Sequence, residues 1–153
     1  MHTGRFVARQ KSTSPAELLG WLSLDNTATS IPLARRFVRI ALTARGFDDH
    51  ATTLELIVSE LVTNAVVHTR PGINQPIWIR LSARPTSLRL EVHDTDVRLP
   101  AARPLENESE SGRGLHIVRA LTDHSGSYLS PRDTGKIVWC ELANAEHAKA
   151  PAA

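Results

Sequence analysis

Two stretches in the middle of the chain alternate between apolar and polar residues. A period of two over residues 75–84 and 86–94 is typical of strands with one buried face. The positions predicted to point inward are Ile77, Ile79, Leu81 and Ala83 in the first stretch and Leu88, Leu90 and Val92 in the second. A short turn near Pro85 separates the stretches, so they are predicted to form an antiparallel hairpin.

Two segments before this hairpin have the period of amphipathic helices. The first, 30–47, has Ser30 as a candidate cap, Pro32 in its first turn and Gly46 near its end. Its predicted apolar face is Leu33, Phe37, Val38, Ala41 and Leu42. The second helix is predicted at 48–68, capped by Asp48 or Asp49 and ended by the turn at Pro71 and Gly72.

The rest of the chain adds a loop, a helix and a second hairpin. Residues 98–111 are rich in proline and charge and predict a loop, and 114–124 predict a third helix. Residues 125–131 and 136–142 predict a closing hairpin. The fold class expected from this order is α+β, a two-layer sandwich with helices on one face of a mostly antiparallel sheet.

Composition and charge then exclude several classes of protein. The chain has 153 residues, of which 41% are hydrophobic and 22% charged, as in a single soluble domain. With one cysteine, Cys140, and no long apolar run or signal peptide, we expect a cytoplasmic protein with no membrane contact. Scattered basic residues and a net charge of +2 argue against direct nucleic-acid binding. Flexible ends are expected at 1–15 and 143–153, around a domain at 16–142.

Polar residues recur on the second helix at Glu60, Asn64 and His68. On a helical wheel Asn64 and His68 lie about 40° and 80° from Glu60, at the edge of the main apolar arc. Polar groups wedged between apolar neighbours need partners. The stripe therefore indicates either hydrogen bonding at the edge of the core or a ligand site.

Two further features have a structural and a functional interpretation. Gly112 and Gly114 directly precede the third helix, where they indicate either a hinge or an anion site at the helix N-terminus. Asp94 and Asp96 follow the second strand, where they are either a polar strand exit or, for Asp94, a buried acceptor for an amino group.

In this order, the features resemble the GHKL or Bergerat-type ATP-binding domain. Within that superfamily the chain is most similar to the short anti-sigma-factor serine/threonine-protein kinases of Gram-positive bacteria. The similar stretches are SELVTNAVVH, VHDTDVRLP, GRGLHIVRAL and TGKIVWCEL. The resemblance spans about residues 20–142 and implies the Bergerat fold.

The resemblance also implies roles for the polar residues. Asn64 would give its side-chain oxygen to Mg²⁺, which prefers hard oxygen ligands. Glu60 would orient or deprotonate the attacking hydroxyl of a protein serine or threonine. Asp94 would accept a hydrogen bond from the adenine amino group. His68 fits the pattern of the family, but no chemical role follows for it.

The same resemblance places the phosphates of ATP at the glycine pair. The backbone of Gly112, Arg113 and Gly114, with Leu115 following, would hold the nucleotide. Residues 97–111 would form a lid over the site, which is an accepted role for so long a loop.

The chain departs from the family pattern in two places. The glycine-rich turn DxGxG reads Asp94-Thr95-Asp96-Val97-Arg98 and has neither glycine. Asp96 adds negative charge near a site for a polyanionic nucleotide, which Mg²⁺ or Arg98 would have to offset. Lys136 stands where a threonine is often found.

Two functions follow from these observations. The first is an ATP-dependent protein serine/threonine kinase that phosphorylates an anti-sigma-factor antagonist and sequesters a sigma factor. The second is a catalytically weak or inactive module that acts only by binding proteins. The family resemblance suggests a homodimer.

Overall fold

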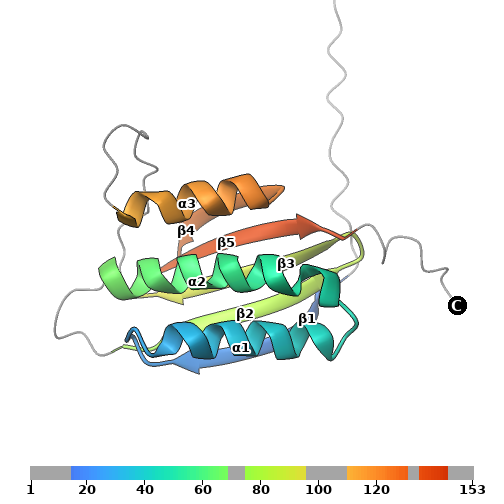
Figure 1. Cartoon of the computed structure of the whole chain (residues 1–153), viewed down its shortest axis with the longest axis horizontal. Coiled ribbons are helices and arrows are strands. Elements are labelled where there is room, and N and C mark those ends of the chain that lie inside the picture. The colour runs from blue at the N-terminus through green and yellow to red at the C-terminus, as the bar shows by residue number, and fades with distance from the viewer. Residues whose placement is uncertain (1–14, 69–74, 96–109, 131–134, 145–153) are drawn as a thin grey trace, which may run out of the picture.

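Three helices cover one face of a five-stranded sheet in the computed structural model of the chain, as Figure 1 shows. The structure describes residues 15–68, 75–95, 110–130 and 135–144. Its elements are β1 (Glu17–Leu24), α1 (Ser30–Thr43), a 3₁₀ turn (Asp48–His50), α2 (Ala51–His68), β2 (Ile77–Arg84), β3 (Ser87–Asp94), α3 (Glu110–Leu121), β4 (His124–Leu129) and β5 (Lys136–Ala143). The two-layer α+β fold expected from the sequence is confirmed.

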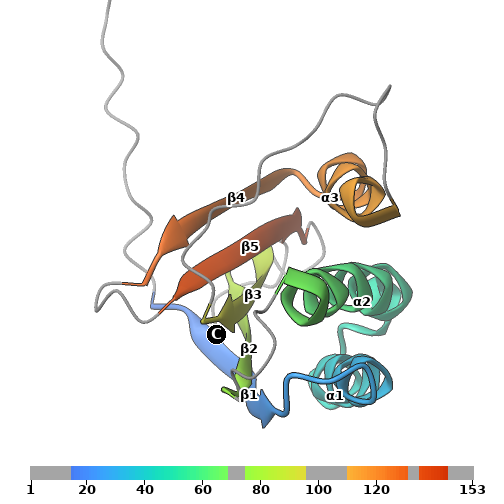
Figure 2. The same cartoon turned by 90° about the vertical axis from the view of Figure 1, so that its left-hand side faces the viewer.

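The sheet has the strand order β1-β2-β3-β5-β4, and every neighbouring pair is antiparallel. The two predicted hairpins are both present, as β2–β3 and β4–β5. Figure 2 shows the helices end-on in one layer, with α2 between α1 and α3. The second helix therefore lies over the middle of the sheet.

The core lies between α2 and the inner face of the sheet. All seven predicted inward positions of β2 and β3 are buried, and Ile77, Ile79 and Leu81 are fully enclosed. From α2, the residues Leu54, Ile57, Val58 and Val62 are equally enclosed. Cys140 of β5 belongs to the same core, and burial raises the pKa of its thiol to about 12. The free energy of burying these side chains holds the two layers together.

β1 is the element that the sequence analysis missed. Its sequence, ELLGWLSL, lacks a clean alternation because the register shifts between Leu18 and Gly20. As an edge strand it also leaves apolar side chains exposed, with Trp21 at 54%. A Cβ on Gly20 would lie 2.8 Å from the Phe37 ring, so the glycine lets β1 run close under α1.

α1 is shorter than predicted because a local motif ends it. The helix ends at Thr43 rather than continuing to residue 47. Gly46 has φ +78°, and the Gly46 and Phe47 N–H groups donate to the carbonyls of Thr43 and Leu42. This is the Schellman pattern, in which glycine takes the left-handed position. Gly46 therefore terminates the helix, as expected, but it lies after the last helical residue.

The start and face of α1 also differ from the expectation. Ser30 is the first residue of the helix and not its cap, and its hydroxyl donates to the carbonyl of Asp25. Leu33, predicted to face the core, is 52% exposed, whereas Ala34 is fully buried. Val38, Ala41 and Leu42 are buried as predicted and Phe37 packs against the core, so the predicted face is wrong only at Leu33.

Contacts of the sheet continue past residue 142. Ala143 is the last residue of β5, and Asn144 is 2% exposed. The Asn144 N–H donates to the carbonyl of Thr86, and its side-chain oxygen lies 3.2 Å from Nε2 of His50. These contacts tie the end of the sheet to the turn that precedes α2.

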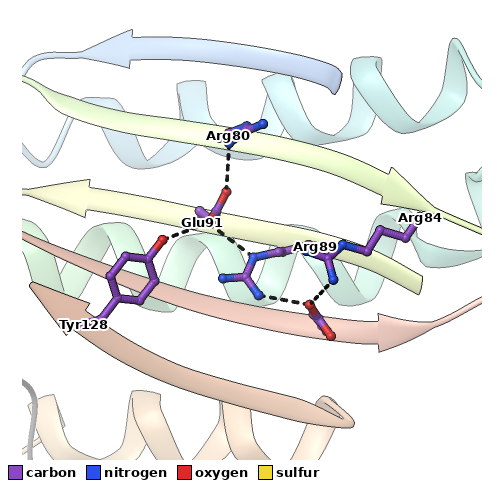
Figure 3. Close-up of polar contacts among 6 residues, drawn as sticks. Arg80, Arg84, Arg89, Glu91 and Tyr128 are labelled. Carbon is purple, nitrogen blue, oxygen red and sulfur yellow. Dashed lines mark hydrogen bonds and ion pairs between the residues drawn. The ribbon is translucent and has the colours of Figure 1, made fainter. Parts of the chain in front are cut away.

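The outer face of the sheet carries a network of charged residues, drawn in Figure 3. Arg89 donates to Glu91 at 3.2 Å and to Glu141 at 2.9 Å. Its guanidinium also lies 4.2 Å from the centre of the Trp139 ring. Trp78, on the same face, stacks against Trp21 with ring centroids 4.5 Å apart. Trp78 and Trp139 therefore both pack against neighbouring side chains.

No helix in the described part of the chain is long and apolar enough to cross a membrane.

Arg89→Ala is expected to lower the free energy of unfolding by about 1–3 kcal/mol, because two partly buried carboxylates lose a shared donor. Arg84→Ala is the matched control. Arg84 is half exposed, and its guanidinium lies 3.9 Å from the same Glu141 carboxylate, so its loss should cost less than about 1 kcal/mol. Urea denaturation of both variants measures the difference, and equal losses would show that the network does not stabilise the sheet.

Candidate functional site

Four chain segments that are distant in sequence meet at one end of the molecule. Figure 1 shows the end of α2, the end of β3 and the starts of α3 and β5 together on its left-hand side. Two contacts fix this meeting. Gly114 of α3 packs against Glu60 of α2, and Asp94 of β3 stands opposite Lys136 of β5. These segments carry most of the residues that the sequence analysis singled out.

The polar stripe of α2 lies at the border of the core. Glu60 and Asn64 are both partly buried. On one side they adjoin Leu61 and Ala65, each 2% exposed, and on the other Val67, which is 59% exposed. Of the apolar residues on the two sides of the stripe, those on one side are therefore buried and Val67 on the other side is exposed. Glu60 and Asn64 occupy the boundary between the core and the surface, where a ligand can reach them.

His68 ends both the stripe and the helix. It is exposed, and it is the last residue of α2. Residues 69–74 follow outside the described part of the chain, including the predicted stop at Pro71 and Gly72. The structure thus places His68 at the rim of the site and gives it no chemical role.

The prediction that the glycine pair precedes the third helix is wrong. α3 begins at Glu110, so Gly112 and Gly114 lie inside its first turns, and it ends at Leu121 rather than 124. The low helix propensity of glycine made the start look later than it is. The last two residues of the expected lid, 97–111, also belong to α3, whereas 97–109 lie outside the described residues.

The shifted helix start divides the roles of the glycines. In an α-helix the first four N–H groups have no partner within the helix. The residue before the helix already accepts a bond from the N–H four residues later, so Arg113 and Gly114 use their N–H groups within the helix, whereas Gly112 is among the residues with a donor left for an anion. The role of Gly112, Arg113 and Gly114 in holding phosphate stays a prediction, and Gly114 has a packing contact besides.

Gly114 lets α3 approach the carboxylate of Glu60. Gly114 is buried, and a Cβ at this position would lie 2.5 Å from Oε2 of Glu60. Any larger residue would displace the carboxylate. Leu115, next in α3, is partly buried against the hydrophobic core. Glycine at 114 thus places the start of α3 beside Glu60.

Asp94 and Lys136 form a buried ion pair at the ends of their strands. They are 3% and 5% exposed, and Nζ of Lys136 lies 3.6 Å from Oδ2 of Asp94. Their positions are paired in the β3–β5 register, with both side chains on the inner face. Buried charges are tolerated when they are paired in this way. The sequence analysis noted Lys136 as a departure from the family but did not predict its partner.

Gly135 fixes the approach of β5 to Asp94. Its φ is +142°, and a Cβ there would overlap the Asp94 carbonyl oxygen at 1.8 Å. Only glycine combines that dihedral angle with so close a backbone contact. Lys136 follows directly, so the position of its side chain opposite Asp94 depends on this glycine.

His93 lies beside the ion pair but on the outer face of the sheet. Its Nε2 is buried and makes no hydrogen bond to the residues that the structure describes. Burial lowers the pKa of His93, against the opposing effect of the neighbouring Asp94 charge. Burial thus favours the neutral form of the His93 imidazole, beside the ion pair of Asp94 with Lys136.

The described residues contain no group of three or more His, Cys, Asp or Glu that could hold a metal ion. A cation that is held mainly by its ligand needs no such group. Mg²⁺ commonly keeps several waters and binds through substrate phosphates with one or two protein oxygens. Asn64, partly buried and one turn after Glu60, offers one such oxygen. The residues present therefore fit Mg²⁺ that arrives with a phosphate ligand.

A family model described as a histidine kinase-like ATPase domain matches residues 24–142, which is most of the chain. The match includes the whole of α2, α3, β3 and the start of β5. A search of curated proteins finds no match.

Gly114→Ala tests the contact between α3 and Glu60. In a free helix this change raises stability by up to about 1 kcal/mol. Here the added methyl group meets the Glu60 carboxylate. Gly114→Ala should therefore raise the free energy of unfolding less when Glu60 is present than in the Glu60→Ala background. We expect a coupling of roughly 0.5 kcal/mol or more in urea denaturation. Ala120→Gly, at an exposed position of α3, is the control and should have the same effect in both backgrounds. Additive effects at position 114 would contradict the contact.

Proposed function

Because the chain belongs to the histidine kinase-like ATPase domain family, which implies ATP binding, we propose that it is an anti-sigma regulatory factor with protein serine/threonine kinase activity. It would bind ATP with Mg²⁺, phosphorylate an anti-sigma-factor antagonist and sequester a sigma factor. The observation that carries the proposal is the meeting of Glu60, Asn64 and Asp94 with the start of α3 at one end of the molecule.

The described residues divide the binding of ATP between them. Asp94 would accept a hydrogen bond from the base, at the buried end of β3. The free N–H groups at the start of α3 would hold phosphate oxygens, aided by the positive end of the helix dipole. Asn64 would contribute an oxygen to Mg²⁺. When bound, ATP and Mg²⁺ supply the phosphoryl group and the neutralising charge.

Glu60 is the proposed catalytic residue. Its carboxylate lies at the border of the core, next to α3, where the phosphates are expected. There it would accept the proton of a serine or threonine hydroxyl on the protein partner. Gly114 assists by leaving room for that carboxylate.

An apolar surface formed by β1 and α1 supports the proposal that the chain binds a protein partner. Large apolar side chains are exposed on β1 and α1, including Leu33 at 52% and Ile40 at 58%. These residues border a groove between the two elements, which is also lined by Leu22 and Phe37. Contiguous exposed apolar residues are typical of interaction surfaces. A sigma factor or a second copy of the chain is the proposed partner, in the cytoplasm.

A module that acts only by protein contact is the second candidate. The observation in its favour is the ion pair of Asp94 with Lys136, together with the absence of both glycines from the turn after Asp94. In such a protein the apolar surface would bind a partner without phosphate transfer. Loss of transfer, but not of partner binding, separates the two candidates.

The first experiment is calorimetric titration of Mg-ATP into the wild type and Asn64→Ala. We expect saturable binding to the wild type and affinity at least about tenfold lower in the variant, because the metal loses a ligand. Val67→Ala is the control, since Val67 is exposed on the same helix and should leave affinity unchanged. Failure of the folded wild type to bind Mg-ATP would refute the proposed function.

The second experiment separates the kinase from the contact module. Glu60→Ala is expected to bind Mg-ATP and the protein partner but to transfer no phosphate. The measurement is transfer of labelled phosphate from ATP to small anti-sigma-factor antagonists encoded by the same genome. Absence of transfer by the wild type, with Mg-ATP bound, would favour the contact module. Undiminished transfer by Glu60→Ala would assign the proton acceptor elsewhere.

A further inference from the structure

The buried lysine beside Asp94 is not explained by stability alone. Lys136 is 5% exposed on the inner face of β5, at the end of the sheet where the nucleotide is proposed to bind. Lysine is almost never so buried unless it is paired. Replacing both members of a buried ion pair by well-packed apolar residues often leaves stability unchanged or raises it. Pairing therefore does not by itself account for the presence of both charges.

The separation of the two charges leaves hydrogen-bonding capacity on Lys136. Nζ lies 3.6 Å from Oδ2 of Asp94, which is beyond a charge-assisted hydrogen bond of about 2.7–2.9 Å. An ammonium group has three N–H donors, and a carboxylate has about four acceptor positions. Side by side, the pair therefore presents a donor and an acceptor to the same end of the inner face.

The backbone holds this donor and acceptor in a fixed order. Asp94 and Lys136 are register partners in adjacent strands. The backbone of Gly135 lies close against the Asp94 carbonyl, so that β5 starts directly beside the end of β3. A ligand edge that binds here must match an acceptor on the β3 side and a donor on the β5 side.

We propose that Lys136 and Asp94 read the base together, with Lys136 donating to ring nitrogen N1 of adenine while Asp94 accepts from the adjacent amino group. The 6-aminopurine edge carries its donor next to its acceptor, in the order that the pair requires. Guanine and hypoxanthine carry a carbonyl oxygen and an N–H in the reverse order, so both contacts would become unfavourable. The inference rests on the proposed binding of ATP, and it makes Lys136 a specificity-determining residue.

The test compares ATP with 1-deaza-ATP, in which a C–H group replaces N1. In the wild type we expect 1-deaza-ATP to bind about tenfold more weakly than ATP, because a buried charged donor loses its acceptor. In Lys136→Met the two nucleotides should bind equally. The ligand 7-deaza-ATP is the control, since it retains N1 and should bind the wild type as ATP does. Calorimetry in the presence of Mg²⁺ measures all three.

The outcomes separate this inference from the proposed function. Binding of ATP without a penalty for 1-deaza-ATP would support the function and overturn the role of Lys136. A penalty of equal size in the wild type and Lys136→Met would also overturn it, because Lys136 would then act only by holding Asp94. Absence of ATP binding would refute both. If Lys136→Met fails to fold, Lys136→Leu takes its place as the variant that lacks the donor.

Discussion

Burial of α2 against the inner face of β2 and β3 is the interaction on which the rest of the structure depends. The helix contributes fully enclosed aliphatic residues such as Ile57 and Val62, and the strands contribute Ile79, Leu90 and others of the same kind. This apolar contact sets the height at which α2 lies above the sheet. Polar residues at the edge of the same helix are consequently held at the edge of the core.

The candidate site is built from close approaches that glycine permits. Gly114 allows α3 to reach Glu60, and Gly135 allows β5 to reach the end of β3. Neither contact contributes a large free energy of its own. Together they bring two carboxylates, on a helix and on a strand, to the same end of a sandwich whose apolar core positions the elements. In the described part of the chain, the candidate site residues are thus positioned by packed helices and strands.

Much of the fold was predictable because burial imposes a period on the sequence. Every second residue from Ile77 to Ala83 in β2 and from Leu88 to Val92 in β3 is apolar and buried, and these inward residues were identified correctly. β1 was missed because an edge strand needs no such alternation on its exposed side, as Trp21 shows. The start of α3 was misplaced because glycine obscures helix propensity. The partner of Lys136 was not predictable, since the pairing of Asp94 with position 136 arises from strand order and not from local pattern.

The place of β1 in the sheet has a consequence for how the chain is made. β1 is synthesised before β2, with which it pairs in the described sheet, and both α1 and α2 lie between the two strands in the sequence. Until β2 emerges, the apolar stretch ELLGWLSL has no strand with which to pair. Such non-local pairing slows folding, and an unpaired apolar strand is prone to aggregate. The nascent chain therefore passes through a vulnerable interval that ends only when β2 has been synthesised.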